Sequence, residues 1–242
     1  MRASNRLVPF LVPLLIAGVA APAGAQPERQ RQARLAATAD ISAPPGVLYD
    51  DCVDHPVRYT VTADPPDATW QLNVDTADPT GARGGGNYRS NSFGDPAAGT
   101  VGVQMCGAAL EPGTFTLSGV LIHGVGNVDP VPPSTFTMRN PMTRTRIKAP
   151  TTEPRRGQRV TITIKSRDEM PEGWRRKDDA RVVLQRDVRS TWVKVQGGRA
   201  RTDEKGKAVL RFAYPGRKTR LRAVTRGSAD WDGSRSSVLV LR

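Results

Sequence analysis

The chain has few residues of the kinds from which most enzyme sites are built. Its 242 residues include two histidines, His55 and His123, and two cysteines. A serine hydrolase needs a histidine held between an acid and a nucleophile, and the pattern Gly-x-Ser-x-Gly is absent. We expect His55 to lie in a loop and His123 to end a strand as a structural residue. The sequence therefore predicts no catalytic residue.

Motifs for metal and phosphate binding are also missing. The spacings His-x-x-x-His and Cys-x-x-Cys do not occur, whereas structural zinc needs four closely spaced ligands. Residues 84–86, Gly-Gly-Gly, are not followed by the Gly-Lys-Ser/Thr of a phosphate loop. We predict no metal and no cofactor, and calcium on loop carboxylates is the alternative that stays open. These carboxylates, which lack EF-hand spacing, belong to Asp50, Asp51, Asp54, Asp64 and Asp67.

Long hydrophobic stretches are absent beyond the first residues. The apolar run 7–21 follows Arg2 and Arg6 and precedes Ala-Gly-Ala at 23–25, which is the pattern of a cleaved signal peptide. The run is shorter than the roughly 20 residues that a bilayer requires. We predict a signal peptide at 1–25, a flexible leader at 26–37, and an exported mature chain without a transmembrane segment.

Cys52 and Cys106 are the cysteines of this exported chain. Oxidising compartments favour pairing, so we predict a disulfide between them, with free thiols or a metal site as the competing interpretations. The two residues are 54 positions apart. Closing a loop of that length stabilises a fold by about 4 kcal/mol in the chain-entropy treatment.

Helical periodicity is missing, and the chain contains 23 glycines and 20 prolines. Short alternating segments separated by turn residues predict an all-β protein of two tandem antiparallel β-sandwiches. We place the domains at 38–140 and 141–242, with a long mobile loop at 78–98. The expected strands are 38–43, 57–63, 69–75, 100–105, 114–123, 135–139, 144–149, 159–165, 181–186, 192–196, 208–214, 219–225 and 237–241.

Acidic and basic residues separate along the same boundary. Residues 38–140 carry four arginines against eleven acids, and residues 141–242 carry 27 basic against 11 acidic residues. The formal net charge of +13 therefore conceals a first domain near −7 and a second near +16.

Four segments of the second half stand out together: Val-Val-Leu-Gln-Arg-Asp at 182–187, Trp-Val-Lys-Val at 192–195, the segment 200–208 and Thr-Arg-Leu-Arg-Ala at 219–223. With these residues, the second half resembles the Ig-like domains of exported actinobacterial proteins. The first half is a more distant match, with Cys52, Trp70 and Cys106 in the Cys…Trp…Cys order. Because Cys52 precedes the predicted strand 57–63, we expect the disulfide to join a loop to a strand. The resemblance implies an immunoglobulin-type fold and indicates little about function.

The basic second domain is the best candidate for a binding surface. A strand with a period of two places Arg144, Arg146 and Lys148 on one face, and residues 174–177, Trp-Arg-Arg-Lys, form an expected basic loop. Such surfaces attract polyanions in a salt-dependent way. The alternatives are a solvated surface or one that docks the acidic first domain. The hypothesised polyanion-binding residues are Arg144, Arg146, Lys148, Arg175, Arg176, Lys177, Arg220 and Arg222.

We predict from these features a secreted, non-enzymatic binding or adhesion module, extracellular or at the cell envelope. Its expected partners are an anionic envelope polymer such as teichoic acid, or an extracellular protein, and no specific nucleic acid. The alternatives are a secreted enzyme or enzyme inhibitor with its site in the 78–98 loop, and a structural spacer.

Overall fold

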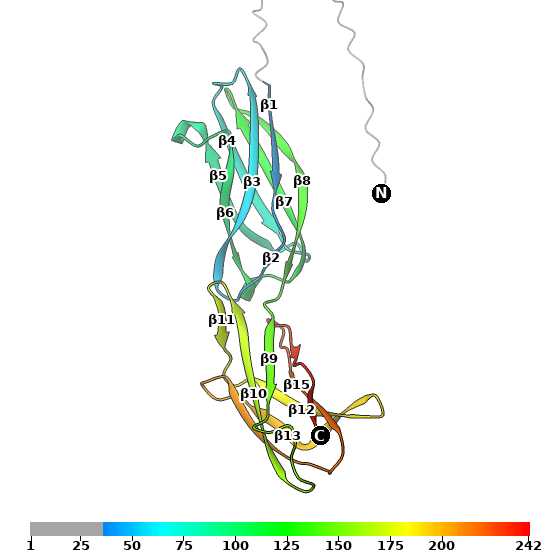
Figure 1. The fold of residues 1–242 in the computed structure, drawn as a ribbon. Coiled ribbons are helices and arrows are strands. Elements are labelled where there is room, and N and C mark those ends of the chain that lie inside the picture. The colour runs from blue at the N-terminus through cyan, green and yellow to red at the C-terminus, as the bar shows by residue number, and fades with distance from the viewer. Residues whose placement is uncertain (1–35) are drawn as a thin grey trace, which may run out of the picture. The chain divides into compact units, whose positions relative to one another are not determined.

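The computed structural model describes residues 36–242. Its regular structure consists of β-strands, apart from two short 3-10 turns (Figure 1). The predicted signal peptide and most of the predicted leader lie outside the described residues. Ala36 and Ala37, which we expected at the end of the leader, instead begin the first strand. No described helix is long and apolar enough to cross a membrane.

The first half of the chain forms a sandwich of two sheets. One sheet has the order β1-β3-β6, and the other has the order β2-β8-β7-β4-β5. All neighbours are antiparallel except β2 and β8, which run parallel. The strands are β1 (Ala36–Ser42), β2 (Gly46–Val47), β3 (Cys52–Asp64), β4 (Trp70–Ala77), β5 (Arg83–Ser90), β6 (Ala98–Cys106), β7 (Gly113–His123) and β8 (Asn127–Arg139).

The second half forms another sandwich. Its first sheet contains β9, β10, β11 and β14, with β10 paired to each of the others. Its second sheet has the order β13-β12-β15-β16, and β17 also pairs with β15. The strands are β9 (Thr143–Lys148), β10 (Arg159–Met170), β11 (Gly173–Arg176), β12 (Arg181–Val188), β13 (Thr191–Arg201), β14 (Lys207–Ala213), β15 (Thr219–Thr225), β16 (Ser234–Arg235) and β17 (Leu239–Leu241).

Alternating burial along the strands builds a separate core in each sandwich. In β10, Val160, Ile162 and Ile164 are buried while the residues between them face outward. The same alternation buries Val57, Tyr59 and Val61 of β3. Because successive side chains of a strand point to opposite faces, each sheet presents an apolar inner face to its partner sheet.

The strand order is that of immunoglobulin-type sandwiches. In that fold the first, second and fifth strands share one sheet, and the third, sixth and seventh share the other. Here β1, β3 and β6 oppose β4, β7 and β8, and β9, β10 and β14 oppose β12, β15 and β17. The predicted fold class, all-β with two tandem Ig-like antiparallel sandwiches, is therefore confirmed.

Segment 78–98 is not the long loop that we predicted from its glycine content. It contains β5, which pairs with β4 from Arg83 to Ser90, and the turn η1 (Asn91–Phe93). Glycine is needed because a Cβ atom on Gly85 would lie 2.1 Å from the carbonyl oxygen of Gln104 in β6. A glycine inside a strand often marks such a close backbone approach.

Two more loop predictions are wrong, because these segments also pair with neighbouring strands. His55 lies inside β3, where its buried ring continues the alternating inner face and stacks on Phe136 with ring centroids 5.1 Å apart. Pro56 is tolerated because β1 pairs with β3 only as far as Arg58. Trp174, Arg175 and Arg176 belong to β11, an edge strand that forms a hairpin with β10.

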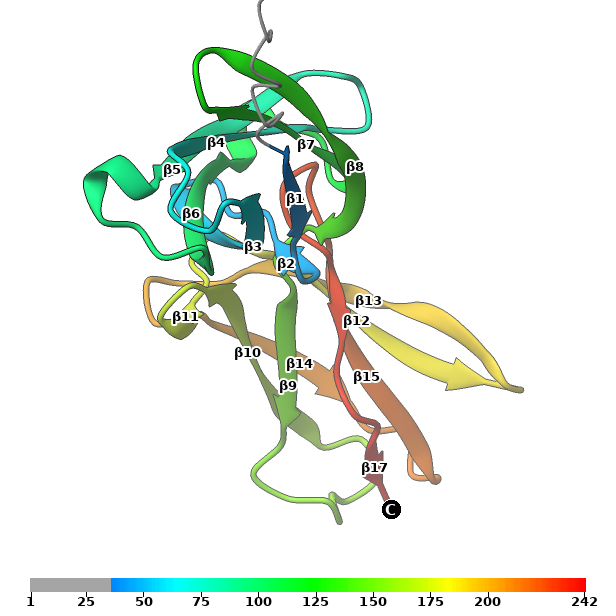
Figure 2. The same ribbon diagram turned by 90° about the horizontal axis from the view of Figure 1, so that it is seen from above.

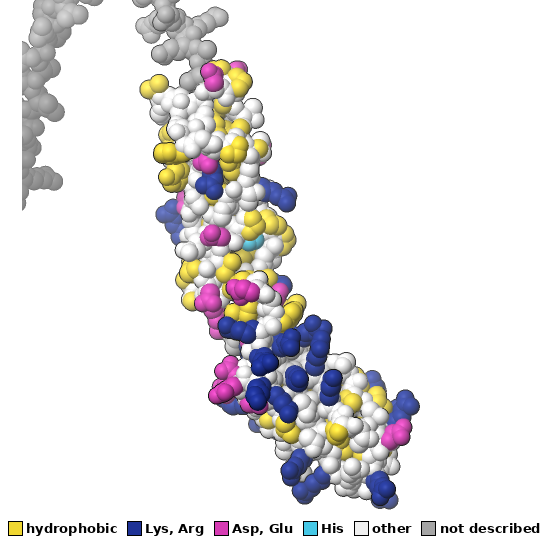
Figure 3. All heavy atoms as spheres, turned by 60° about the vertical axis from the view of Figure 1, so that its left-hand side comes forward, with side chains coloured by type: hydrophobic (Ala, Val, Ile, Leu, Met, Phe, Trp, Pro, Cys, Tyr) yellow, Lys and Arg dark blue, Asp and Glu magenta, His cyan; other side chains and the backbone are white. Residues whose placement is uncertain are grey.

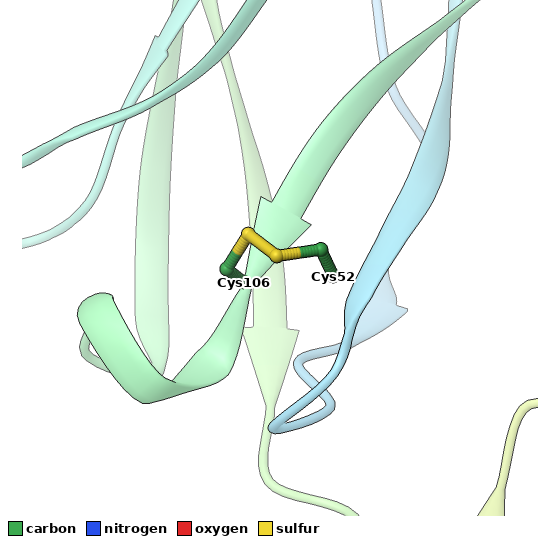
Figure 4. Close-up of a disulfide and its surroundings, with 2 residues drawn as sticks. All are labelled: Cys52 and Cys106. Atoms are coloured by element: carbon green, nitrogen blue, oxygen red, sulfur yellow. A yellow bond between two sulfur atoms is a disulfide. The ribbon is translucent and has the colours of Figure 1, made fainter.

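The disulfide between Cys52 and Cys106 is present (Figure 4). Cys52 is the first residue of β3, so our expectation that it precedes the strand is wrong. Cys106 is the last residue of β6, and the two cysteines face each other in the register of the neighbouring strands. The crosslink therefore joins two strands of one sheet and closes the end of their ladder.

Replacing both cysteines with serine should destabilise the first sandwich by about 4 kcal/mol, because the unfolded chain regains the freedom of a 54-residue separation. Urea unfolding of the full chain, with Trp174, Trp192 and Trp231 replaced by phenylalanine so that fluorescence reports the buried Trp70 alone, measures this loss. An unchanged midpoint would contradict a stabilising role for the disulfide.

Arg189 and Ser190 form the two-residue turn between β12 and β13, a hairpin that extends beyond its sheet (Figure 2). Both have positive φ, 50° and 66°, which suits Asn-Gly in a type I′ turn. The substitutions Arg189→Asn and Ser190→Gly together should stabilise the second sandwich by about 1 kcal/mol, measured by urea unfolding. Ser190→Ala keeps the Cβ atom and should give no gain. An equal gain from the alanine variant would contradict relief of backbone strain.

Asp78 anchors the turn from β4 to β5. Its carboxylate accepts hydrogen bonds from the backbone N–H groups of Glu111, Thr80 and Ala82 and from the Thr80 hydroxyl. These bonds, the one from Glu111 foremost, hold the pKa of Asp78 below its ordinary value of 3.8. A depressed pKa in the folded state stabilises the fold above that value, and the contribution disappears as the pH falls through the folded-state pKa.

Asp78→Asn should therefore lower stability at neutral pH and flatten the loss of stability on acidification below about pH 4. Thermal unfolding from pH 7 down to pH 2 follows both effects. Asp67→Asn is the matched control, because Asp67 is exposed and its side chain makes no hydrogen bond among residues 36–242. A control variant that behaves like Asp78→Asn would contradict this role.

Candidate anion-binding surface

Nine basic side chains lie on the outer face of the sheet formed by β9, β10, β14 and the edge strand β11. Alternation along each strand directs them outward, away from the buried residues between them. Figure 3 shows Lys and Arg side chains gathered on this second half of the chain. We call this surface the basic face. It consists of Arg144, Arg146, Lys148, Arg159, Lys165, Arg167, Arg176, Lys207 and Arg211.

Cross-strand pairing places like charges directly opposite one another. Arg167 of β10 lies between Arg144 of β9 and Arg176 of β11. Two residues earlier along β10, on the same face, Lys165 lies between Arg146 and Lys207. Like charges directly opposite one another destabilise a sheet. This arrangement therefore lowers the stability of the fold, which indicates that the cations serve another purpose.

Among residues 36–242, none of these nine side chains forms an ion pair with a carboxylate, because each ion pair there involves another basic residue. A small groove of about 120 Å³ lies between the side chains of β9 and β10. Its lining comprises Arg144, Arg146, Lys148, Thr163, Lys165 and Arg167.

An exposed aromatic ring borders the basic face. Trp174 of β11 is 38% exposed. The guanidinium carbon of Arg144 lies 5.9 Å from the centre of its ring. This cation–π contact orients Arg144 without neutralising its charge.

Lys177 is engaged elsewhere. Its ammonium lies 2.9 Å from the Asp168 carboxylate and 4.5 Å from the centre of the Trp231 ring. Burial raises the pKa of Asp168, and the hydrogen bond and charge of Lys177 oppose this rise. Arg175 pairs with Asp168 in the strand register and so points away from the side that carries Arg176. The structure therefore brings only Arg176 of this basic run to the basic face.

Arg220 and Arg222 lie on the other sheet of the second sandwich. Arg220 donates a hydrogen bond of 2.9 Å to Asp187, and Arg222 donates one of 2.7 Å to Gln185. Both guanidinium groups also lie over the Trp192 ring, with carbons 5.9 and 4.3 Å from its centre. These two arginines do not join the basic face.

Five of the nine residues were missed in the sequence interpretation: Arg159, Lys165, Arg167, Lys207 and Arg211. The alternation that was recognised in β9 continues in β10 and β14 and could have indicated their outward direction. Which strands are neighbours, and in what register, depends on long-range pairing that one sequence does not reveal.

The two histidines lie in the first sandwich. The Nε2 atom of His55 is 2.9 Å from the carbonyl oxygen of Pro44, and burial lowers the pKa of His55. The Nε2 atom of His123 is 2.7 Å from the Asp129 carboxylate, and its buried Nδ1 atom has no hydrogen-bond partner. Among residues 36–242, no group of three or more His, Cys, Asp or Glu side chains could hold a metal ion.

Comparisons with known proteins give structural matches alone. No family model and no curated protein matches the chain. The Yersinia pseudotuberculosis adhesin InvE is 11% identical, with a TM-score of 0.32, over 86% of this chain and 60% of the adhesin. The fibronectin(III)-like modules of Clostridium thermocellum CbhA are 12% identical, with a TM-score of 0.29, over 84% of this chain and 91% of the modules.

The D00-D0 domain of intimin is 10% identical to this chain, with a TM-score of 0.32, over 86% of this chain and all of that domain. At such TM-scores, the fold assignment rests on the strand order described above. The chain spans about 60% of the adhesin InvE.

Proposed function

We propose that this protein is an exported, non-enzymatic module that binds an anionic polymer of the cell envelope through the basic face. The observation that carries the proposal is the set of nine outward cations on paired strands with no carboxylate partner among the described residues. A polyanion would supply the missing charges and release its own counterions on binding.

The spacing of the cations supports a polymer as the ligand. Alternate residues of a strand are about 7 Å apart, and neighbouring strands are about 4.8 Å apart. The rows Arg144–Arg167–Arg176 and Arg146–Lys165–Lys207 therefore form a dense two-dimensional array. Teichoic acids and acidic glycans carry closely repeated charges that can contact several of these cations at once. Such multiple contacts give affinity without a deep pocket.

Export and an envelope location are part of the same proposal. The signal-peptide pattern at 1–25 supports export, and the disulfide between Cys52 and Cys106 is of a kind that persists in oxidising compartments. The actinobacterial resemblance of the second half remains a sequence-based expectation.

The charge reversals Arg146→Glu and Lys165→Glu test the basic face. They change two cations that are cross-strand partners and line the groove. On a heparin column, the double variant of the full chain should elute at markedly lower salt than the unmodified chain, because two contacts are lost and two repulsions are added. Immobilised teichoic acid should give the same order of elution.

The matched control is Arg217→Glu with Lys218→Glu. These residues are exposed in the turn between β14 and β15, outside the basic face, and the control has the same net charge as the test variant. It should retain most of the affinity for heparin. If both double variants eluted together, net charge alone would explain retention, and the proposed surface would be wrong.

A further inference from the structure

A second basic site lies on the other sheet of the second sandwich, around Val183 of β12. Val183 points outward, between the core residues Val182 and Leu184, yet it is 8% exposed. Its cross-strand neighbours are Arg199 of β13 and Val224 of β15. Long side chains can cover an outward apolar residue in this way.

Four arginines surround this valine. Arg181 is the cross-strand partner of Arg201, and the backbone N–H of Arg226 donates to the carbonyl oxygen of Arg181 at 3.0 Å. Arg201 of β13, Arg181 of β12 and Arg226, the residue that follows β15, thus lie in one row. Arg199 stands in the adjacent row on the same face.

These residues line an open pocket of about 390 Å³. Its lining includes Val183 and all four arginines. This volume falls in the range of about 300–1,000 Å³ that is usual for small-molecule sites. We call this site the arginine pocket.

The charges of the arginine pocket are only partly compensated. Arg201 pairs with the Asp179 carboxylate. Arg181, Arg199 and Arg226 have no carboxylate partner in the described part of the chain, and their side chains donate no hydrogen bond there. Three arginines of the lining without a carboxylate partner leave an excess positive charge of a kind that a compact dianion can balance.

We infer that the arginine pocket binds a phosphate monoester with a small apolar body. Guanidinium groups match phosphate oxygens in a bidentate geometry, and a phosphate monoester carries a charge of about −1.5 to −2 at pH 7. The apolar body would pack against the aliphatic stems of the lining arginines, since Val183 itself is only 8% exposed. The site is independent of the proposed polymer-binding function, because the basic face belongs to the opposite sheet.

Calorimetric titration of the full chain with phenyl phosphate tests this inference. We expect saturable binding of one molecule. Inorganic phosphate should bind several-fold more weakly, because it lacks an apolar body to pack against the arginine stems. Phenyl sulfate, a monoanion of similar shape, should also bind more weakly. Arg181→Gln with Arg226→Gln should weaken the binding of phenyl phosphate about 10-fold or more, since each charge-assisted contact that is lost weakens binding by this order.

The matched control, Arg217→Gln with Lys218→Gln, removes the same charge outside the pocket and should bind phenyl phosphate like the unmodified chain. The pocket variant should also keep its retention on heparin, which separates this inference from the proposed function. Absence of saturable binding, equal weakening in the control, or tighter binding of phenyl sulfate would each overturn the inference. Circular dichroism of every variant establishes that the fold is retained.

Discussion

The two-residue period of the β-strand is the constraint on which this structure depends. A strand that buries every second side chain must expose the others. The same strands therefore supply both the core and the outer surface of each sandwich. In β10 this rule places Ile162 and Ile164 in the core and Lys165 and Arg167 outside. Packing two sheets therefore fixes the positions of the outward cations as firmly as those of the apolar residues.

The second sandwich combines a well-packed interior with an unbalanced exterior. Residues such as Val160, Leu184 and Leu221 are buried in one core cluster, while arginines face arginines across neighbouring strands outside. Exposed ion pairs contribute about 0–1 kcal/mol each to stability, so their absence from the basic face lowers the stability of the fold only slightly. An anion that binds there would nevertheless relieve the repulsion between neighbouring cations, which favours its binding. Since the basic face and the arginine pocket lie on opposite sheets, a ligand at one leaves the other accessible.

The sequence was sufficient for the fold class, because alternation and turn residues are local signals. It was insufficient where distant segments meet. Gly85 looked like part of a loop, although it permits β5 to approach Gln104 of β6. His55 looked like a loop residue, although it lies inside β3 and completes an apolar face beside Phe136. Lys177 looked available for a ligand, although Asp168 and Trp231 engage its ammonium. The outward direction of Arg144 could be predicted, whereas its pairing with Arg167 required the strand order.

We propose that the outward cations on β9, β10, β11 and β14 form one continuous polyanion-binding surface. Backbone amide chemical shifts of the full chain, followed during titration with a short heparin fragment, test this proposal most directly. The largest changes should fall on these four strands and should diminish as salt is added. Changes concentrated in the first sandwich, or no changes at low salt, would contradict it.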